Sequence, residues 1–254
     1  MIMKPDSPLV GALHPSPNTE DRRKGCRPDM ILLHYTGMSS AEDAIGWLAN
    51  PKSKVSCHYV VDEAGYITQM VAEGKRAWHA GVSHWAGEAD INSVSIGIEI
   101  QNPGHEHGYP DFPPEQMHAI AALCLDIAQR RGVRPERVLA HSDVAPGRKI
   151  DPGEKFDWAA LAKHGVGHWV KQAPLDGDGR RTLDEDTAAV EEATYLLTRY
   201  GYDFEPRARD DWFAVVVRSF QLHFRPARTD GRLDAGTLDT LRRLVAALPA
   251  PITS

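Results

Sequence analysis

Short apolar runs mark strands along the first two-thirds of the chain. Met30–Leu33 is a continuous apolar run of strand length, typical of a strand buried on both faces of a mixed or parallel sheet. Two runs within residues 57–71 flank a turn that ends in Gly65, and this spacing predicts a hairpin. Residues 95–100 and 138–140 predict a central strand and a last core strand. We therefore expect a mixed central β-sheet.

Helical spacing lies between these runs. Apolar positions repeat every three or four residues in 39–50 and in 115–131, and Gly132 is a typical stop for the second of these helices. A short closing helix is expected at 157–162. The pattern predicts an α/β fold, a mixed central sheet flanked by helices, in a domain that spans residues 28–172.

The two ends of the chain differ from this domain. Residues 1–27 are rich in proline and charge without periodicity, so we expect an extended arm with no chemical role. Residues 171–179 have the composition of a linker. Beyond it, three amphipathic patterns predict a small three-helix bundle at 180–250, with Thr182 and Glu185 as the capping box of its first helix.

Composition and charge exclude several classes of function. The formal net charge is -6 and no basic block is present, which argues against nucleic acid as a partner. No run approaches the roughly 18 uninterrupted apolar residues that a membrane span needs. The cysteines Cys26, Cys57 and Cys124 are odd in number and scattered, so we interpret them as free thiols in a reducing compartment.

The start of the chain bears on localisation. Met1-Ile2-Met3-Lys4 is followed at once by Pro5, so the apolar core of a secretory signal is missing here. We therefore expect a cytoplasmic protein. A start codon placed too late or a missing leader would give the same sequence, which keeps the periplasm or cell envelope as the alternative.

Candidate chemistry concentrates in the loop 140–153. His141 follows a strand and Asp151 is presented ten residues later, so both can face one divalent cation, because zinc accepts imidazole nitrogen and carboxylate oxygen in one tetrahedral shell. A further ligand is needed. His34 directly follows the first apolar run, at the sheet edge where open α/β sheets place their ligands. On spacing alone, a structural histidine at position 34 remains the alternative.

Other polar positions are less decisive. The segment Trp78-His79 with His84-Trp85 suits the wall of a groove for a sugar face or peptide stem, or else a packed loop. Glu99 lies between Ile98 and Ile100, where a carboxylate needs a compensating cation or donor unless it faces solvent from an edge strand.

The remaining histidines of interest are expected to have no catalytic role. We expect His58 in the core or behind the site, and His105 and His107 in a loop that does not hold a metal. His14 and His118 are expected to be exposed.

The loop motif also carries a family resemblance. His141-Ser142-Asp143 and the following Ala-Pro-Gly-Arg-Lys-x-Asp-Pro-Gly resemble the signature loop of the zinc-dependent N-acetylmuramoyl-L-alanine amidases, which share their fold with peptidoglycan recognition proteins. Segments 32–36, 56–61, 77–81 and 92–102 resemble, in order, the remaining blocks of that family. The resemblance covers the first two-thirds of the chain.

The resemblance implies roles for individual residues. His34, His141 and Asp151 would hold one zinc ion per chain and leave a fourth position for water. Glu99 would act as the base and Lys149 would face the developing oxyanion. Four further residues are expected to contact substrate: Trp78, His79, Asn102 and Arg148, the last through a stem-peptide carboxylate. Cys57 stands where phage-type members have tyrosine, which points to the Glu-dependent branch.

The implied reaction is hydrolysis of the amide bond between the lactyl group of N-acetylmuramic or anhydro-muramic acid and L-alanine. Peptidoglycan fragments or muropeptides would be the partners, in cell-wall turnover and recycling. Residues 219–238 resemble the peptidoglycan-binding type 1 module, although 204–211 lacks the first Gly-x-Asp turn of many such modules. A bundle that only supports the domain is the alternative there. For the whole chain, a non-catalytic peptidoglycan receptor and a metallopeptidase that cuts another amide remain open.

Overall fold

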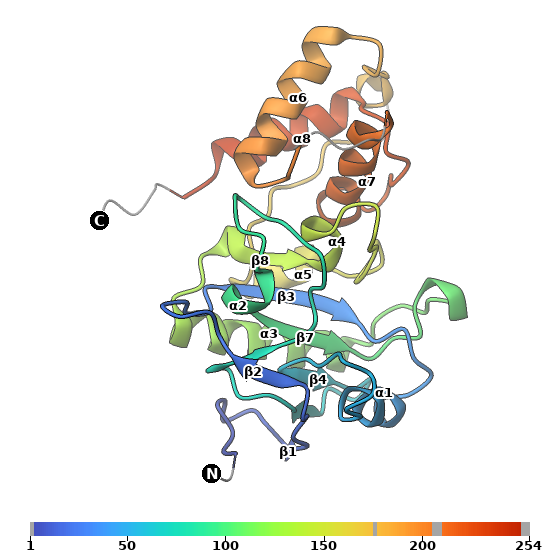
Figure 1. Cartoon of the computed structure of the whole chain (residues 1–254). Coiled ribbons are helices and arrows are strands. Elements are labelled where there is room, and N and C mark those ends of the chain that lie inside the picture. The colour runs from blue at the N-terminus through green and yellow to red at the C-terminus, as the bar shows by residue number, and fades with distance from the viewer. Residues whose placement is uncertain (1–2, 175–176, 205–209, 250–254) are drawn as a thin grey trace.

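Six strands form the central sheet. The structure, a computed structural model shown in Figure 1, describes residues 3–174, 177–204 and 210–249. The strand order is β1-β5-β4-β7-β3-β8. Only β4 and β5 pair antiparallel, and the other neighbours run parallel, so the predicted mixed sheet is confirmed. The bounds are β1 Ala12–Leu13, β3 Met30–Tyr35, β4 Tyr59–Val61, β5 Ile67–Gln69, β7 Ser95–Ile100 and β8 Val138–Ala140.

The N-terminal segment is part of this architecture. It supplies β1 to the edge of the sheet, and β2 (Thr19–Asp21) pairs antiparallel with β6 (Lys75–Ala77) in a second, two-stranded sheet. The side-chain amide of Asn18 donates to the backbone oxygens of Asn50 at 2.9 Å and Val55 at 2.8 Å. These strands of two and three residues are too short to give a period, which is why the sequence indicated only an extended arm.

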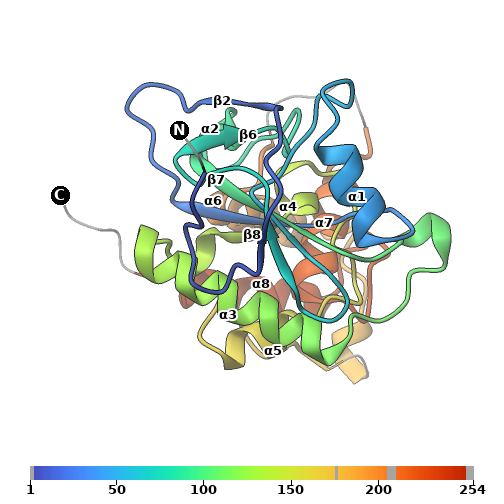
Figure 2. The same cartoon turned by 90° about the horizontal axis from the view of Figure 1, so that it is seen from below.

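Helices cover both faces of the sheet. On one face α3 (Pro114–Arg131) lies beside α5 (Trp158–Lys163), as Figure 2 shows. On the other side α1 (Ala41–Leu48) begins at the N-cap Ser40. Gly132 ends α3 with φ +70°, as expected for a residue in the left-handed region. The short helical segments are α2 (Ile91–Val94), η1 (His105–His107), η2 (Pro135–Arg137), α4 (His141–Val144) and η3 (Gly177–Arg180).

Alternation along β3 divides the core into two layers. Ile31 and Leu33 pack with α3 and α5, whereas Met30 and Leu32 belong to the cluster on the opposite face. His34 continues the second set, because side chains alternate along a strand. The predicted burial on both faces is confirmed, and it directs His34 to the face opposite α3.

The predicted three-helix bundle is present as α6 (Thr187–Tyr200), α7 (Trp212–Phe224) and α8 (Ala235–Ala246). The expected capping box is wrong. The N-cap is Asp186, whose side chain accepts from the backbone N–H of Ala189, while the Thr182 hydroxyl donates to Asp184. Several acidic acceptors in a row made the start of this helix ambiguous in the sequence.

The bundle and the sheet share one hydrophobic core. Met30, Leu32 and Trp85 lie in the same buried cluster as Phe220 and Leu244 of the bundle. In Figure 1 α4 lies between the sheet and α7. No helix within the described ranges is long and apolar enough to cross a membrane.

Candidate metal centre and active site

Three parallel strands bring the candidate residues to one edge of the sheet. His34 in β3 is the register partner of Glu99 in β7. His141 directly follows β8 and opens α4, so a helical turn stands where the sequence indicated a loop. Because the carboxyl ends of parallel strands meet at one edge, residues more than a hundred positions apart come together there.

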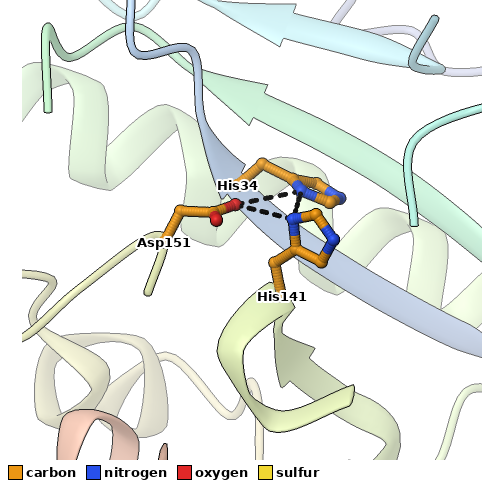
Figure 3. Close-up of side chains that lie close together, drawn as sticks. All are labelled: His34, His141 and Asp151. Atoms are coloured by element: carbon orange, nitrogen blue, oxygen red, sulfur yellow. Dashed lines mark hydrogen bonds and ion pairs between the residues drawn. The ribbon is translucent and has the colours of Figure 1, made fainter. Parts of the chain in front are cut away.

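His34, His141 and Asp151 point toward one another in Figure 3. The Nδ1 atoms of the two imidazoles are 2.9 Å apart, and Asp151 Oδ2 lies 3.2 Å from His34 Nδ1 and 2.9 Å from His141 Nδ1. All three side chains are buried. The structure therefore brings the three predicted ligands into one cluster.

A chain of hydrogen bonds determines which nitrogen of His34 carries its proton. The Ser95 hydroxyl donates to the Ile91 carbonyl at 2.6 Å, so it accepts from His79 Nε2 at 3.3 Å. His79 Nδ1 is then the acceptor for His34 Nε2 at 3.0 Å. This leaves the Nδ1 lone pair of His34 directed into the cluster.

The loop that contains His79 and Ala80 also orients His141. Its Nε2 lies 3.0 Å from the Ala80 carbonyl, which can only accept, and 3.3 Å from the Arg148 guanidinium, which can only donate. The shorter contact favours a proton on Nε2, which leaves the Nδ1 lone pair of this ring free for the cluster. The side-chain oxygen of Asn92 accepts from the backbone N–H groups of His79 at 3.0 Å and Ala80 at 2.9 Å. Gly97 makes room for this arrangement, because a Cβ there would lie 2.5 Å from the His79 ring.

The cluster suits a divalent cation. Two imidazole lone pairs and a carboxylate oxygen converge, and ligand atoms around tetrahedral zinc stand about 3.3 Å apart, close to the separations found here. Burial, reinforced by His141, lowers the pKa of His34 to about 4, so the imidazole is neutral as a ligand must be. Burial alone would raise the pKa of Asp151, but His141 and His34 hold it well below its ordinary value. Hydrogen bonds from both rings to a backbone carbonyl or a further side chain are typical of metal-binding histidines.

Glu99 provides a carboxyl group that can exchange a proton. It lines the cavity beside the cluster, and its Oε2 is buried without a hydrogen-bond partner among the described residues. Burial, followed by the negative charge of Asp151, raises the pKa of Glu99 well above its ordinary value, and Lys149 opposes this. A nearby divalent cation would lower the pKa of Glu99, as Lys149 does. An acid in such surroundings suits general acid–base chemistry.

The cavity over the cluster has a volume of about 540 Å³, in the range of small-molecule sites. Trp47 and Trp78 line one part of it, and Tyr35 and His105 another. His105 Nδ1 lies 3.1 Å from the Tyr35 hydroxyl, and its Nε2 lies 3.0 Å from Glu154. Sequence reasoning missed this second wall, because the loop of His105 gave no signal that it faces the site.

Of the residues expected to contact substrate, three line the cavity and Asn102 does not. Trp78 and His79 line the cavity, as do Lys149 and Arg148. The Arg148 guanidinium also donates to the backbone oxygens of Ala80 at 2.5 Å and of Val82 at 2.9 Å. It therefore braces the loop that orients the two histidines.

Asn102 is not among the residues that line the cavity. It is buried, its amide donates to the Pro110 carbonyl at 2.9 Å, and its oxygen accepts from the Gly104 backbone at 2.9 Å. Trp85 also lies elsewhere, because its ring packs against the bundle.

The burial of His58, His14 and His118 and the state of the cysteines agree with the sequence interpretation. His58 is fully buried and accepts from the Gly97 backbone N–H at 2.9 Å, and burial with the charge of Arg22 lowers its pKa to about 3. His14 and His118 are exposed. All three cysteines are free thiols.

A cluster that could hold a metal ion, beside a carboxyl group with a raised pKa, is an arrangement found in hydrolases that use a metal ion. Comparison with known proteins defines the family. The chain belongs to the N-acetylmuramoyl-L-alanine amidase family, whose model matches residues 24–154.

Individual relatives agree with this assignment. N-acetylmuramoyl-L-alanine amidase AmiD of Escherichia coli is 38% identical over 228 residues, which cover 83% of this chain and 80% of AmiD. 1,6-anhydro-N-acetylmuramyl-L-alanine amidase AmpD of Escherichia coli is 32% identical over 169 residues, which cover 59% of this chain and 90% of AmpD. The relatives thus include one whose match covers 83% of this chain and one whose match covers 59% of it.

Solved structures show the same fold. The complex of Escherichia coli AmiD with anhydro-N-acetylmuramic acid-L-Ala-D-gamma-Glu-L-Lys has a TM-score of 0.77 at 32% identity, covering 89% of this chain and 92% of AmiD. AMPDH3 from Pseudomonas aeruginosa, in complex with anhydromuramic pentapeptide, has a TM-score of 0.75 at 34% identity and covers 88% of this chain and 93% of that one.

Proposed function

We propose that this chain hydrolyses the amide bond between the lactyl group of N-acetylmuramic acid and L-alanine, and that a zinc ion held by His34, His141 and Asp151 assists the reaction. The observation that carries the proposal is the convergence of three ligand atoms within 3.2 Å of one another, with Glu99 in the same cavity. Family membership supports the bond that is cut.

The residues around the cluster have separate tasks. When bound, zinc supplies a Lewis acid and lowers the pKa of a water molecule to about 7. Glu99 accepts a proton from the water that attacks the lactyl carbonyl carbon, and it returns this proton to the nitrogen of L-alanine as the C–N bond breaks. Lys149 stabilises the negative charge that develops on the carbonyl oxygen. The products are a free lactyl carboxylate and a peptide with an L-alanine amino terminus.

The substrates that fit this proposal are muropeptides, including those with an anhydro sugar. The solved structures of AmiD and AMPDH3 are complexes with anhydromuramyl peptides, and this chain resembles both over most of its length. A cavity of about 540 Å³ leaves room for a sugar and the first residues of a stem peptide. Such a substrate agrees with a role in wall turnover and recycling. Cytoplasmic localisation stays a prediction that cell fractionation tests.

Glycan binding by the bundle also stays a prediction. The resemblance to a peptidoglycan-binding module rests on motif residues whose contacts are internal: Gln221 Oε1 accepts from the Gly231 backbone at 2.8 Å, and Asp234 caps α8. The buried Arg225 pairs with Asp234. The segment 204–211, which lacks the Gly-x-Asp turn of many such modules, lies partly outside the described residues, at positions 205–209. These contacts support a motif that holds α7 against α8, and sedimentation of the chain with insoluble peptidoglycan tests for binding.

The decisive experiment identifies the product. The full chain is incubated with a purified anhydro-muropeptide, with and without a chelator, and the fragments are separated by mass. We expect a free stem peptide that begins with L-alanine, no product after chelation, and very little from Glu99→Gln. Cleavage between two amino acids would favour a metallopeptidase, and binding without any cleavage would favour a receptor.

A further inference from the structure

A buried polar cluster joins the bundle to α4. The hydroxyl of Tyr202 donates to Asp143 Oδ1 at 2.5 Å, and His223 Nδ1 lies 2.6 Å from Asp143 Oδ2. Asp143 is fully buried, and Tyr202 and His223 are each 2% exposed. The His223 ring is stacked on Trp158 at 3.6 Å between ring centroids. Such a cluster is rigid, because a buried carboxylate needs every donor it has.

This cluster acts on the helical turn that carries a metal ligand. His141 is the first residue of α4, and Asp143 lies in the same turn. Asp143 Oδ2 also accepts from the backbone N–H of Ala140 at 2.8 Å, which holds the start of the turn. The backbone N–H of Ser142 donates to the carbonyl of Asp151 at 3.0 Å. The position of α4 therefore sets the place of two of the three ligands.

The bundle also braces the loop behind the histidines. The Trp85 ring packs edge-on against Tyr202 at 4.8 Å between centroids, and the backbone N–H of Ala86 donates to the Gly201 carbonyl at 2.8 Å. The N–H of His84 donates to the Val144 carbonyl of α4 at 2.8 Å. This loop begins with His79 and Ala80, whose acceptor atoms orient His34 and His141. The bundle therefore contacts both α4 and the loop that orients the two histidines.

We propose that Tyr202 and His223 are positioning residues of the metal centre, which act through Asp143 and α4 on His141 and Asp151. The inference rests on the proposed zinc site. It makes the bundle a structural part of the active site, in addition to any contact it has with the cell wall. Residues that orient metal ligands typically change metal affinity by about 10- to 100-fold when they are removed. Tyr202 and His223 act one contact further from the metal, so we expect values at the lower end.

The test measures the zinc dissociation constant of the full chain by competition with a chromophoric chelator. Tyr202→Phe removes one hydroxyl and is expected to weaken zinc binding about 10-fold. His223→Ala is expected to do the same or more, and His223→Asn, which keeps a donor near the Nδ1 position, is expected to restore part of the loss. Tyr195→Phe is the matched control, because Tyr195 is a 61% exposed tyrosine on α6 and should leave the constant unchanged.

Melting temperatures of the metal-free variants separate positioning from simple support. If Tyr202→Phe and His223→Ala melt earlier but bind zinc as tightly as the parent chain, the inference is wrong and the cluster only stabilises the fold. If His223→Ala does not fold, Tyr202→Phe decides by itself. A parent chain that binds no zinc would refute the proposed function, a failure that is distinct from equal zinc affinity in parent and variants.

Discussion

Replacing Glu99 by glutamine should reduce activity and stabilise the metal-free protein at the same time. The glutamine has nearly the same shape but cannot accept the proton of the attacking water. Removing a general base typically lowers kcat by about 10²- to 10⁴-fold, which corresponds to about 2.7–5.5 kcal/mol of barrier. Because Glu99 is not one of the three clustered ligands, zinc content should not change.

The stability effect follows from the raised pKa of Glu99. Its Oε2 is buried without a partner among the described residues, and the folded metal-free protein resists the ionisation that the unfolded chain undergoes near pH 4.5. The carboxyl group therefore destabilises the fold increasingly as the pH rises above 4.5, and not below it. Replacing it with a neutral amide should gain about 1 kcal/mol at neutral pH, or about 2–4 °C in Tm for a chain of this size.

Two measurements check both halves of this prediction. Turnover of a muropeptide by zinc-loaded Glu99→Gln gives the loss of kcat, and thermal unfolding of the metal-free protein at pH 4 and pH 8 gives the stability difference. We expect equal Tm values at pH 4 and a higher Tm for the variant at pH 8. A variant that keeps kcat within about 10-fold of the parent, or one that is less stable at pH 8, would refute the reasoning.

Three other substitutions test separate parts of the structure. Asp151→Asn removes the carboxylate from the cluster and should abolish zinc retention on a desalting column, with the fold intact by circular dichroism. Gly97→Ala should push the His79 ring away from His34 and weaken zinc binding by about 10- to 100-fold, measured by chelator competition. Glu73 is fully buried. Burial alone would raise the pKa of Glu73, but hydrogen bonds from arginine and tyrosine lower it from 4.5 to about 2. It therefore stabilises the fold above pH 4.5, by about 3 kcal/mol, and this contribution is lost as the pH falls toward 2. Urea unfolding should show Glu73→Gln less stable than the parent at pH 7 by that amount and nearly equal to it at pH 2.

Sequence patterns predicted the strands of the central sheet except β1, and they placed His34, His141 and Asp151 where a metal site could form. The apolar run before His34 predicted a buried strand, and β3 places that ring at the edge of the sheet. The run before His141 did the same for β8. These features are local, because a strand and the residue that follows it are adjacent in the chain. The family resemblance decided the role of His34, which on spacing alone could equally be structural, and the structure brings this ring to the same cluster as His141 and Asp151.

The remaining parts depend on contacts between distant segments. His79 was expected to contact substrate, but its contacts with His34 and Ser95 join three separate segments. The bundle was expected as a separate module beyond a linker, yet Tyr202 reaches Asp143 from a position 59 residues away. The periodicity of the sequence cannot predict such contacts, because the two partners are ordinary polar residues that lie far apart in the chain.

In the proposed function, one metal ion on this cluster is needed for the reaction. The most direct test prepares the metal-free chain with a chelator, then adds zinc in steps while bound metal and release of the L-alanyl peptide are measured together. We expect activity to rise in proportion to bound zinc and to reach its maximum at about one equivalent per chain. Full activity in the metal-free chain, or zinc binding without any gain in peptide release, would contradict the account.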